Sequence, residues 1–598
     1  MAVFRSDQSQ LTYAMEAAPG GDPELNNGTL TSTHCDIKGA VTAGTSQVEY
    51  DGIANGPFIV GDMVRIGPGT STSDATSSTT APYEVRRIVH GTDLSANNNT
   101  MFFDRPLAFN HVDNTTVTEI SAASTTQAHK IITEVPGVYE SITVPDMTPS
   151  FEPRYFLGTA SKRDWTKMYV GAQSFTGSLP SFIALNGKPL RWAIGTVSDV
   201  PSAVESASTD INGAVSKGDI YVTLDGSHGY SAGDFIVFAS ADQADPETAD
   251  STADAVTGQE IQKIAAFPST NVARLEKPFR FDHPDNAPAR EVSSGATVKH
   301  HIEEASLLDT MSWHVHMRDS GETAANDFDR RYVGGFVGSC NISADEGGML
   351  MTGWDSVQFL DAFHNQENVS QPNVNPGSEA NNTGVFSGDS FAAGMPRFTD
   401  MLKIASGDIS LPTTEPYYFS QGQVKIMGQE FARVRSFNLG ITNGEEARYY
   451  IAPRFGRQRG PAEIREGRRS YGLSCTLALP DTAASATGIS RDSATEFFKQ
   501  LLMEGNYGSG MEGFNIEITF TRGTNDSIQI LIPADYTSGD ETSGADVGLP
   551  DSNGENGNGA FLTGAPHPIS GEPILQVGAE FSCRNLKIIV TDSEYVYT

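Results

Sequence analysis

The chain of 598 residues has few cysteines and no hydrophobic run long enough to cross a membrane. A membrane-spanning helix needs about 18 or more apolar residues in succession, and the N-terminus also lacks the apolar core of a signal peptide. Three of the four cysteines, Cys340, Cys475 and Cys583, sit in strand-like patterns, Cys35 is remote, and no CxxC pair occurs. We therefore expect buried apolar thiols rather than a disulfide framework or metal site, in a soluble protein made in the cytoplasm.

Lysine is also scarce. The chain has 13 lysines and 27 arginines against 74 acidic residues, which gives a formal net charge of -34. Many carboxylates and few lysines suit a protein that stays soluble in molar salt, where the Debye length falls to about 3 Å and self-repulsion is screened. The alternative is an acidic protein from an ordinary-salt organism. We favour a salt-loving source, an archaeon.

Catalytic motifs are missing. The sequence contains no GxSxG, no HExxH, no P-loop and no GxGxxG that opens a helix. His314 and His316 alternate on a predicted strand and so share a face that could chelate a metal. Trp313 beside them and the lack of a third nearby ligand favour a packed strand instead. We expect no catalytic residue, no cofactor and no bound metal, and we predict that the protein is not an enzyme.

The sequence does contain a clear internal duplication. VGDMVRI (60–66), YEVRRI (83–88) and FFDRPLAFNHVDNTTV (102–117) return as AGDFIVF (232–238), QEIQKI (259–264) and RLEKPFRFDHPDNAPAREV (274–292). Asp62, Pro106, Phe109 and His111 each recur 172 residues later, as do Asp113 and Asn114. About five short strands in each copy predict two small β-barrels or sandwiches, inserted in a larger fold.

Each copy ends in a Phe-x-His-x-Asp-Asn run that has two interpretations. His111 with Asp113, and His283 with Asp285, are compatible with a metal or sugar site repeated twice. The simpler interpretation is a turn in which Asp and Asn bond nearby backbone while His packs against the hairpin. We favour the turn.

Residues 422–479 contain two predicted strands on either side of an arginine-rich loop. Phe437, Leu439 and Ile441 share one strand face, as do Tyr471, Leu473, Cys475, Leu477 and Leu479, whereas Gly472, Ser474, Thr476 and Ala478 form a small polar face. The loop, 448–469, carries seven arginines: Arg448, Arg454, Arg457, Arg459, Arg465, Arg468 and Arg469. Loops of this length inside a domain are usually functional.

The partner of these arginines is open to three interpretations. Arginine suits ion pairs with carboxylates at interfaces, and in an acidic homo-oligomer a neighbouring subunit supplies them. Phosphate contacts with DNA are the second interpretation, but the chain is acidic overall and the loop lacks interleaved aromatics for base stacking. A solvated loop is the third. We take the seven arginines as candidate inter-subunit contacts.

Other segments give local predictions. Ser181–Leu185 and Leu190–Ile194 read as a hairpin around Asn186-Gly187, and 332–343 with 349–357 as strands joined at the Gly347-Gly348 turn. A helix is expected from the capping box Ser493 to Glu496 through Leu502, ending at Gly505. The segments 515–521 with 527–532, and 574–591, each predict a strand pair.

The order of parts resembles the major tail tube protein of tailed viruses. It is carried by Gly428–Phe437, Ile441 with Asn443, the Gly460–Arg469 loop and the strand SLPSF at 178–182. The resemblance covers 416–598 well and 152–358 more loosely. It implies a mainly β, tail-tube-like sandwich or barrel with one short packed helix, to which the duplication adds two small β-barrel accessory domains.

The expected organisation has seven parts. They are an N-terminal arm (1–30), accessory domain 1 (31–121), the first part of the tube domain (122–204), accessory domain 2 (205–298), a continuation of the tube domain (299–362), an extended arm (363–415), and a second half (416–598) with the arginine-rich loop 448–469 and an acidic loop 535–567.

The resemblance also implies a function. The chain would be a virion protein of a siphovirus-like virus and a protomer of stacked rings that form the tail tube. The resemblance implies sixfold rings, and a threefold ring of duplicated tube folds is the alternative that the sequence leaves open. Its partners would be itself and other tail proteins such as tape measure, terminator and baseplate components. DNA would pass the lumen unbound, and no membrane would be involved. The main rival is an adhesin with duplicated carbohydrate-binding modules; a glycan-degrading enzyme lacks a nameable acid/base pair.

Overall fold

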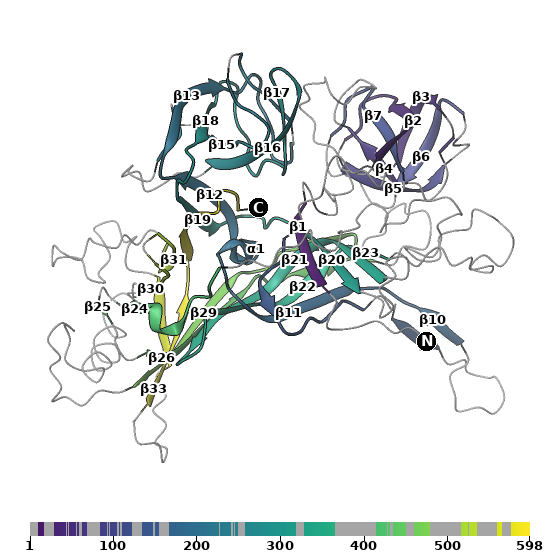
Figure 1. Cartoon of the computed structure of the whole chain (residues 1–598). Coiled ribbons are helices and arrows are strands. Elements are labelled where there is room, and N and C mark those ends of the chain that lie inside the picture. The colour runs from purple at the N-terminus through teal and green to yellow at the C-terminus, as the bar shows by residue number, and fades with distance from the viewer. Residues whose placement is uncertain are drawn as a thin grey trace, which may run out of the picture.

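Strands dominate the computed structural model and form two packed sheets and two small barrels (Figure 1). The structure describes residues 10–16, 29–42, 47–55, 57–58, 63–67, 84–91, 96–103, 110–121, 134–146, 150–154, 167–219, 221–226, 228–240, 245–248, 258–317, 328–364, 414–426, 429–430, 434–449, 460–478, 516–523, 525–534, 559–564 and 576–597, with positions 19, 45, 94, 107 and 243. The predicted mainly β fold is confirmed.

The largest sheet has 11 strands, of which eight form one path whose neighbours all pair antiparallel. In order, the path is β32 (Ala560–Gly564), β33 (Gln576–Cys583), β29 (Ser470–Ala478), β26 (Val434–Thr442), β21 (Phe328–Asp345), β22 (Met351–Phe359), β11 (Phe175–Ile183) and β8 (Val138–Tyr139). The N-terminal part of β21 also pairs with β20 (Met311–Met317) and β23 (Asp361–His364), and β20 pairs with β1 (Gln10–Met15).

A second sheet of seven strands packs on the apolar face of the first. Its order is β12 (Gly195–Pro201), β19 (Val298–Glu304), β34 (Lys587–Asp592), β31 (Ser527–Ile532), β30 (Ile516–Thr521), β24 (Gly422–Ile426) and β25 (Gln429–Glu430). Both sheets contribute to one buried core, in which the rings of Phe437 and Phe520 lie 5.7 Å apart. Burial of this apolar area is the main stabilising term of the body.

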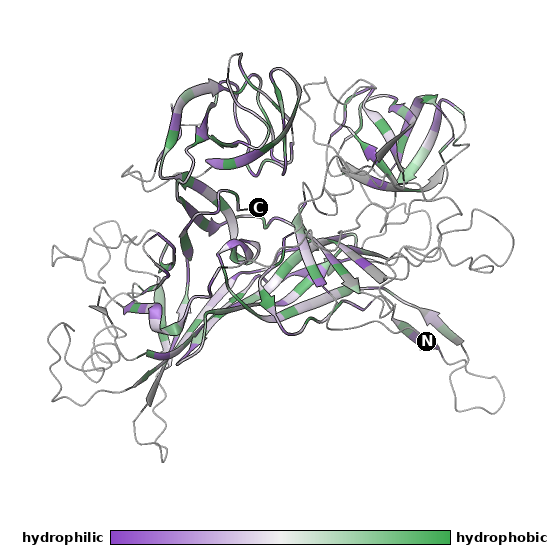
Figure 2. Ribbon diagram, in the orientation of Figure 1, coloured by the Kyte–Doolittle hydropathy of each residue, from purple (hydrophilic) through white to green (hydrophobic). Residues whose placement is uncertain are grey.

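The period-2 pattern of the sequence is what makes these strands. In β26, Phe437, Leu439 and Ile441 are buried while Asn438 and Thr442 are exposed, as predicted. Figure 2 shows hydrophobic and hydrophilic residues intermixed along the strands of the large sheet. Only β-structure places every second side chain on the core side.

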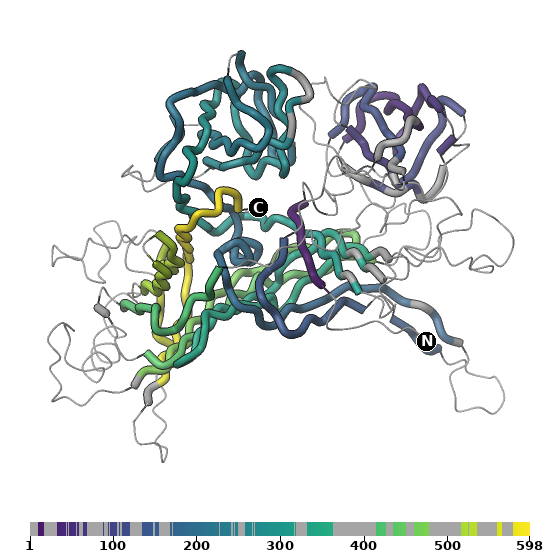
Figure 3. The backbone as a smooth tube through the Cα atoms, in the orientation of Figure 1, coloured from purple at the N-terminus to yellow at the C-terminus, as the bar shows by residue number. Residues whose placement is uncertain are grey.

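The N-terminal segment joins this sheet. We expected an extended arm over 1–30, but β1 pairs with β20 from Gln10 opposite His316 to Met15 opposite Met311. Figure 3 shows β1 lying against strands from much later in the chain. The Tyr13 ring meets Trp192 and Trp354 edge-on at 5.9 and 5.4 Å, which ties the segment into the core.

Each half of the duplication forms six strands, one more than we predicted. The first closes into a barrel of β2 (Thr29–Ile37), β3 (Gln47–Ala54), β6 (Asn99–Phe103), β5 (Glu84–Gly91), β4 (Met63–Ile66) and β7 (Thr116–Ser121). The second has the equivalent order β13 (Val204–Asp210), β18 (Pro288–Val292), β15 (Phe235–Phe238), β16 (Glu260–Ser269), β17 (Val272–Leu275) and β14 (Tyr221–Thr223), and an Ile211–Leu224 bridge joins its two ends.

The second barrel grows out of the second sheet. Its entering strand β12 and leaving strand β19 are paired over their whole length, from Gly195 opposite Glu304 to Pro201 opposite Val298. These two strands form a neck beneath the barrel (Figure 1). A paired neck is stiffer than two separate linkers, because the ladder hydrogen bonds fix both strands together.

The hairpin predicted around Asn186-Gly187 is wrong. Residues 188–194 form a short 3-10 helix (η3, Lys188–Leu190) followed by α1 (Arg191–Ile194). Glycine is required at 187 because a Cβ atom there would lie 2.3 Å from Val590 Cγ2 of β34. The glycine therefore permits a close approach between segments and does not form a turn.

Two further predictions need correction. The segment 574–591 does form two strands, but β33 and β34 belong to different sheets and do not pair. Part of the predicted acidic loop, Ala560–Gly564, is the edge strand β32. The helix predicted after Ser493 and most of the 363–415 arm lie outside the described residues, and Asp361–His364 is β23.

Two short hairpins complete the described elements, together with η6 (Phe419–Gln421). One pairs β9 (Phe151–Arg154) with β10 (Lys167–Val170), and the other pairs β27 (Glu446–Arg448) with β28 (Glu463–Arg465). No described helix has the length and apolar content needed to span a membrane.

Candidate assembly surfaces

The outer face of the large sheet is lined by small polar residues. The register aligns Ser582, Gly472, Gly440 and Asn341 in one row across four strands. The next row holds Glu580, Ser474, Asn438 and Ser343. The predicted small polar face is therefore continued by the neighbouring strands.

This face is open. A Cβ atom at Gly472 would meet no atom within 4 Å, and one at Gly440 would meet only the Gly472 carbonyl oxygen, at 3.8 Å. The outward positions of the two rows carry one carboxylate, Glu580, and no lysine or arginine. Asp355 of β22 adds a second exposed carboxylate, which accepts hydrogen bonds from the Asn341 amide at 2.8 and 3.0 Å.

Both ends of the eight-strand path are open edges. Among the described strands, none pairs with the outer side of β32 or of β8. Val138 in β8 is 45% exposed although it is apolar. Unpaired backbone N–H and C=O groups at such edges favour pairing with another strand.

The predicted arginine-rich loop starts at the last residue of β27 and includes β28, and these two strands pair as a hairpin. Glu446 lies opposite Arg465, and Arg448 lies opposite Glu463, so charges alternate across the ribbon. Arg448 Nη2 lies 2.6 Å from Glu446, and Arg465 Nε lies 2.5 Å from Glu463. Exposed pairs of this kind contribute about 0–1 kcal/mol each.

The other five candidate arginines differ in environment. Arg468 is exposed, whereas Arg454, Arg457 and Arg459 lie outside the described residues. Arg469 is only 10% exposed and acts within its own chain. It donates to the Ile194 carbonyl at 3.1 Å and lies 3.2 Å from Glu466 and 3.4 Å from Glu304. Arg469 therefore holds the hairpin to α1 and β19.

The repeated His-Asp run forms the turn that we favoured. Asp113 Oδ1 accepts the Gly39 N–H at 2.6 Å, and Asp285 Oδ1 accepts the Gly213 N–H at 2.7 Å. His111 and His283 are both buried at 1% exposure. No group of three or more His, Cys, Asp or Glu side chains in the described residues is arranged to hold a metal ion.

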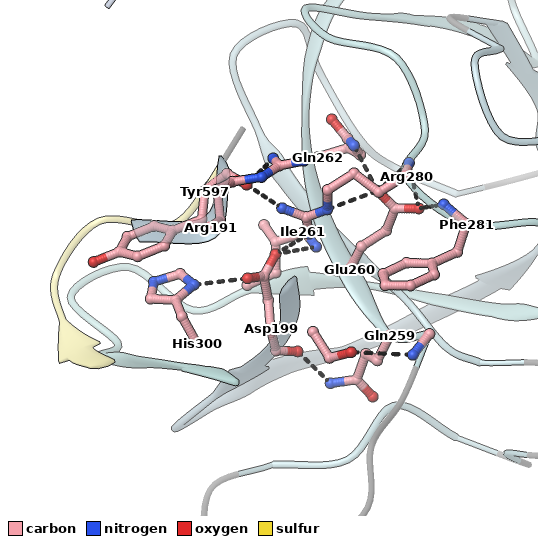
Figure 4. Close-up of polar contacts among 12 residues, drawn as sticks. Arg191, Asp199, Gln259, Glu260, Ile261, Gln262, Arg280, Phe281, His300 and Tyr597 are labelled. Atoms are coloured by element: carbon pink, nitrogen blue, oxygen red, sulfur yellow. Dashed lines mark hydrogen bonds and ion pairs between the residues drawn. The ribbon is translucent and has the colours of Figure 1, made fainter. Parts of the chain in front are cut away.

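Our sequence analysis did not predict the buried ionic cluster where the second barrel meets its neck (Figure 4). Arg280 of the barrel forms an ion pair with Asp199 of β12 and donates to the Tyr597 carbonyl, and its Nε lies 3.4 Å from Glu260. Asp199 also lies 2.6 Å from His300 Nδ1 and accepts the Ile261 N–H at 3.0 Å. The three partners of Arg280 thus come from the neck (Asp199), the barrel (Glu260) and the C-terminal segment (the Tyr597 carbonyl).

Two further ion pairs extend the contact between barrel and body. Asp309 pairs with Arg191 of α1 and lies 2.6 Å from Lys217 of the barrel. Glu134 lies 2.5 Å from Lys277 of the barrel and 3.4 Å from Lys188 of η3. Burial by itself would raise the pKa of Glu134, but the two ammonium groups outweigh burial and lower it to about 2.

His300 is held in its charged form. Burial would lower its pKa, but Asp199 and Asp592 together raise it to about 9. The Tyr597 ring stacks on the imidazolium with centroids 3.5 Å apart. Burial would also raise the pKa of Asp199, and Arg280 and His300 lower it instead. The cluster therefore consists of paired charges at neutral pH.

One sequence signal could have pointed to this cluster. The position equivalent to Arg280 in the first repeat, 172 residues earlier, is Ala108. The two copies therefore differ at the residue that joins the second barrel to the body.

The comparisons with known proteins agree with this architecture. A family model described as phage tail tube protein matches residues 160–583, which is more than half of the chain. The match spans β11, β21, β22, β26, β29 and β33 of the large sheet together with the second barrel, and the first barrel lies before it. A search of curated proteins gave no match. The chain therefore belongs to the phage tail tube protein family.

Proposed function

We propose that copies of this chain close into rings, that the rings stack into a hollow tail tube, and that viral DNA passes through it to the host. The observation that carries the proposal is the large sheet. Among the described residues it has two open edges and a small polar face that no other layer covers. Open strand edges favour pairing with another chain, and a small polar face is suited to contact with water.

Ring closure follows from strand direction. Because neighbours alternate along the eight-strand path, β32 and β8 run in opposite directions. The β32 edge of one copy can therefore pair antiparallel with the β8 edge of the next. A closed ring leaves no unpaired edge on the large sheet, which is the general advantage of barrels and cyclic assemblies.

The polar face would line the bore. Duplex DNA binds tightly to surfaces that offer lysine or arginine to its phosphates. The rows through Gly472 and Ser474 offer hydroxyls, amides, glycine and the Glu580 carboxylate instead. Such a wall lets DNA slide without specific binding.

The strand count bears on ring symmetry. The family resemblance implies six protomers, but each copy here contributes eight strands to the wall. With strands about 4.8 Å apart and tilted by about 40°, three copies give a backbone diameter of about 50 Å and six give about 100 Å. Duplex DNA is about 20 Å wide. We therefore propose three protomers in each ring.

The barrels would face outwards. The neck strands β12 and β19 belong to the second sheet, which packs on the face opposite to the polar rows. The second barrel lies on the side of the large sheet opposite to the polar rows (Figure 1), which would be the outside of the tube. Other tail proteins, including tape measure, terminator and baseplate components, would bind the tube in the virion after synthesis in the host cytoplasm. The net charge of -34 supports a halophilic archaeal host.

Electron microscopy of the purified protein in molar salt tests the proposal. We expect hollow rods with an annular repeat and threefold end-on averages. A sixfold average would overturn the ring count and leave the tube intact. Monodisperse monomers at every salt and protein concentration would overturn the tube, and retention of those monomers on a glycan column would favour an adhesin.

A further inference from the structure

After Asp592, the last residue of β34, the chain crosses the junction between the second barrel and the body. Residues 594–597 belong to no strand or helix, yet Tyr597 is fully buried. We call these four residues the strap. In Figure 1 the yellow end of the chain lies beside the neck strands β12 and β19. Buried polar groups outside a strand ladder need side chains or water as partners.

Charged side chains of the junction bind the main chain of the strap (Figure 4). His300 Nε2 donates to the Glu594 carbonyl at 2.8 Å, and Arg191 Nη1 donates to the Tyr597 carbonyl at 2.8 Å. Arg280 donates to the same Tyr597 carbonyl from the barrel. Hydrogen bonds from charged donors are stronger than those from neutral donors. The strap is therefore held through its carbonyl oxygens, as a bound peptide is.

Tyr597 has partners for both its ring and its hydroxyl. The ring stacks on His300 with centroids 3.5 Å apart, and Lys188 Nζ lies 5.9 Å from the ring centroid. The hydroxyl donates to Asp592 and accepts the Gly187 N–H at 3.1 Å. A buried donor without a partner costs about 1–3 kcal/mol. The site therefore favours tyrosine over phenylalanine at this position.

Tyr595 makes the corresponding contacts with the barrel. Its ring meets Phe235 of β15 at 4.8 Å between centroids, and its hydroxyl accepts the Gly295 N–H at 2.9 Å. Tyr595 and Val596 also pack against a buried apolar cluster of the barrel and neck, formed by Val237, Ile261, Val292, Ala296 and Val298. The two tyrosines of the strap thus bind on opposite sides of the junction.

The strap can leave without disrupting either sheet. The ladder of β34 with β19 ends at Asp592, and its ladder with β31 ends at Thr591. The side chain of Glu594 is 53% exposed and lies 3.1 Å from Lys188 at the rim. Exposed pairs of this kind contribute about 0–1 kcal/mol. The strap is therefore held by the tyrosines and carbonyl oxygens, and its contacts are separate from those that build the second sheet.

We propose that this junction is a peptide-recognition site for the pattern Tyr-x-Tyr, that the strap fills it in cis, and that a filled site holds the second barrel on the body. The inference goes beyond the proposed tube, because every contact lies within one chain. Since Tyr595 contacts the barrel and Tyr597 contacts the body, a bound peptide joins the two. An empty site leaves only the direct ion pairs between them, such as Lys277 with Glu134.

A chain truncated after Ser593, combined with a synthetic peptide of residues 593–598, tests the proposal on the unassembled protein. We expect the Ile261 amide, which the strap helps to cover, to exchange hydrogen about tenfold faster or more in the truncated chain. Saturating peptide should restore the slow rate. Unchanged exchange in the truncated chain would overturn the proposal.

Peptide variants measured by calorimetry test the recognition pattern. A Tyr597→Ala peptide should bind the truncated chain about tenfold more weakly or worse, because it loses a buried ring and two hydrogen bonds. A Glu594→Ala peptide is the matched control and should bind within about fivefold of the original, since it loses only the exposed pair with Lys188. Equal binding of all three peptides would overturn the recognition of tyrosine.

The full chain with Tyr597→Phe gives a readout that does not require the truncated chain to fold. Phenylalanine keeps the ring on His300 but loses the hydroxyl that accepts the Gly187 N–H. We expect the Gly187 amide to exchange about tenfold faster, whereas Tyr595→Phe should leave Gly187 unchanged and accelerate Gly295 instead. Equal exchange at Gly187 in the variant and the unaltered chain would overturn the site. Failure of the unaltered protein to form tubes would affect none of these measurements.

Discussion

Replacing Arg280 with alanine should loosen the second barrel from the body. The guanidinium is 2% exposed and joins three parts of the chain: Asp199 of the neck, Glu260 of the barrel and the Tyr597 carbonyl of the C-terminal segment. Alanine leaves two buried carboxylates without their strongest cation. Removal of one partner from a buried ion pair typically destabilises a protein by about 3–5 kcal/mol.

The remaining contacts place this variant at the low end of that range. Asp199 keeps His300 and the Ile261 N–H, and Glu260 keeps His283 at 3.0 Å. The Tyr597 carbonyl keeps the Arg191 guanidinium at 2.8 Å. Because every acceptor retains a donor, we expect about 3 kcal/mol, which makes local opening about 100-fold more frequent.

Hydrogen exchange followed by mass spectrometry measures this opening. The informative amide is that of Ile261, which donates across the boundary from barrel to neck. Arg290→Ala is the matched control, since Arg290 lies in the same barrel but pairs with Asp245 at 2.6 Å on the surface. An exposed pair contributes about 0–1 kcal/mol, so the control should accelerate exchange by about fivefold or less. Equal hydrogen-exchange rates in the two variants would refute the conclusion that the buried ionic cluster holds the second barrel to the body.

Three further predictions concern this boundary, the arginine-rich loop and the polar face. Raising the pH should weaken the same boundary, because the pKa of His300 is raised to about 9. The charged form of His300 contributes about 3 kcal/mol to the stability of the boundary below pH 6.5. This contribution is lost as the pH rises through 9. Limited proteolysis across that range should show the change, and a His300→Gln variant whose profile is equally steep would contradict it. Replacing Arg457, Arg459 and Arg468 with glutamate should abolish assembly while the circular dichroism spectrum stays unchanged. A normal yield of rods would contradict the assignment of the arginine-rich loop 448–469 to the interface between subunits. The Gly472→Lys variant should fold and form rods, because a Cβ atom at residue 472 would meet no atom within 4 Å. Its rods should retain DNA on co-sedimentation, whereas rods of the unaltered protein should not.

The local sequence pattern predicted the structure correctly wherever that structure depends on residues that are neighbours in the chain. The alternation in 437–441 and 471–477 predicted both the strands and their exposed face. The repeated Asp and Asn predicted the turns at 113–114 and 285–286, where both asparagines adopt the left-handed conformation at φ 65° and 63°. The 172-residue offset predicted two similar barrels, because equivalent side-chain sequences select equivalent strand pairings.

Local pattern failed where the environment of a residue overrides its preference. Asn186-Gly187 is a strong hairpin signal, yet Gly187 is needed for its approach to Val590. Ala560–Gly564 lies in an acidic, glycine-rich stretch, and its strand exists because β33 offers it an edge. Arg469 looked like its neighbours in the loop, but its carboxylate and carbonyl partners come from β19 and α1.

The amino-acid order alone determined that this protein is built from alternating strands, carries two copies of one barrel, and leaves a small polar face on its largest sheet, because side-chain period is a property of neighbours in the chain. Only the tertiary structure decided which strands form the path from β32 to β8, that Arg469 holds its hairpin to α1 and β19, and which residues join the second barrel to the body. Those features depend on contacts between residues as distant as Arg191 and Tyr597, and no local pattern encodes a pairing across that separation.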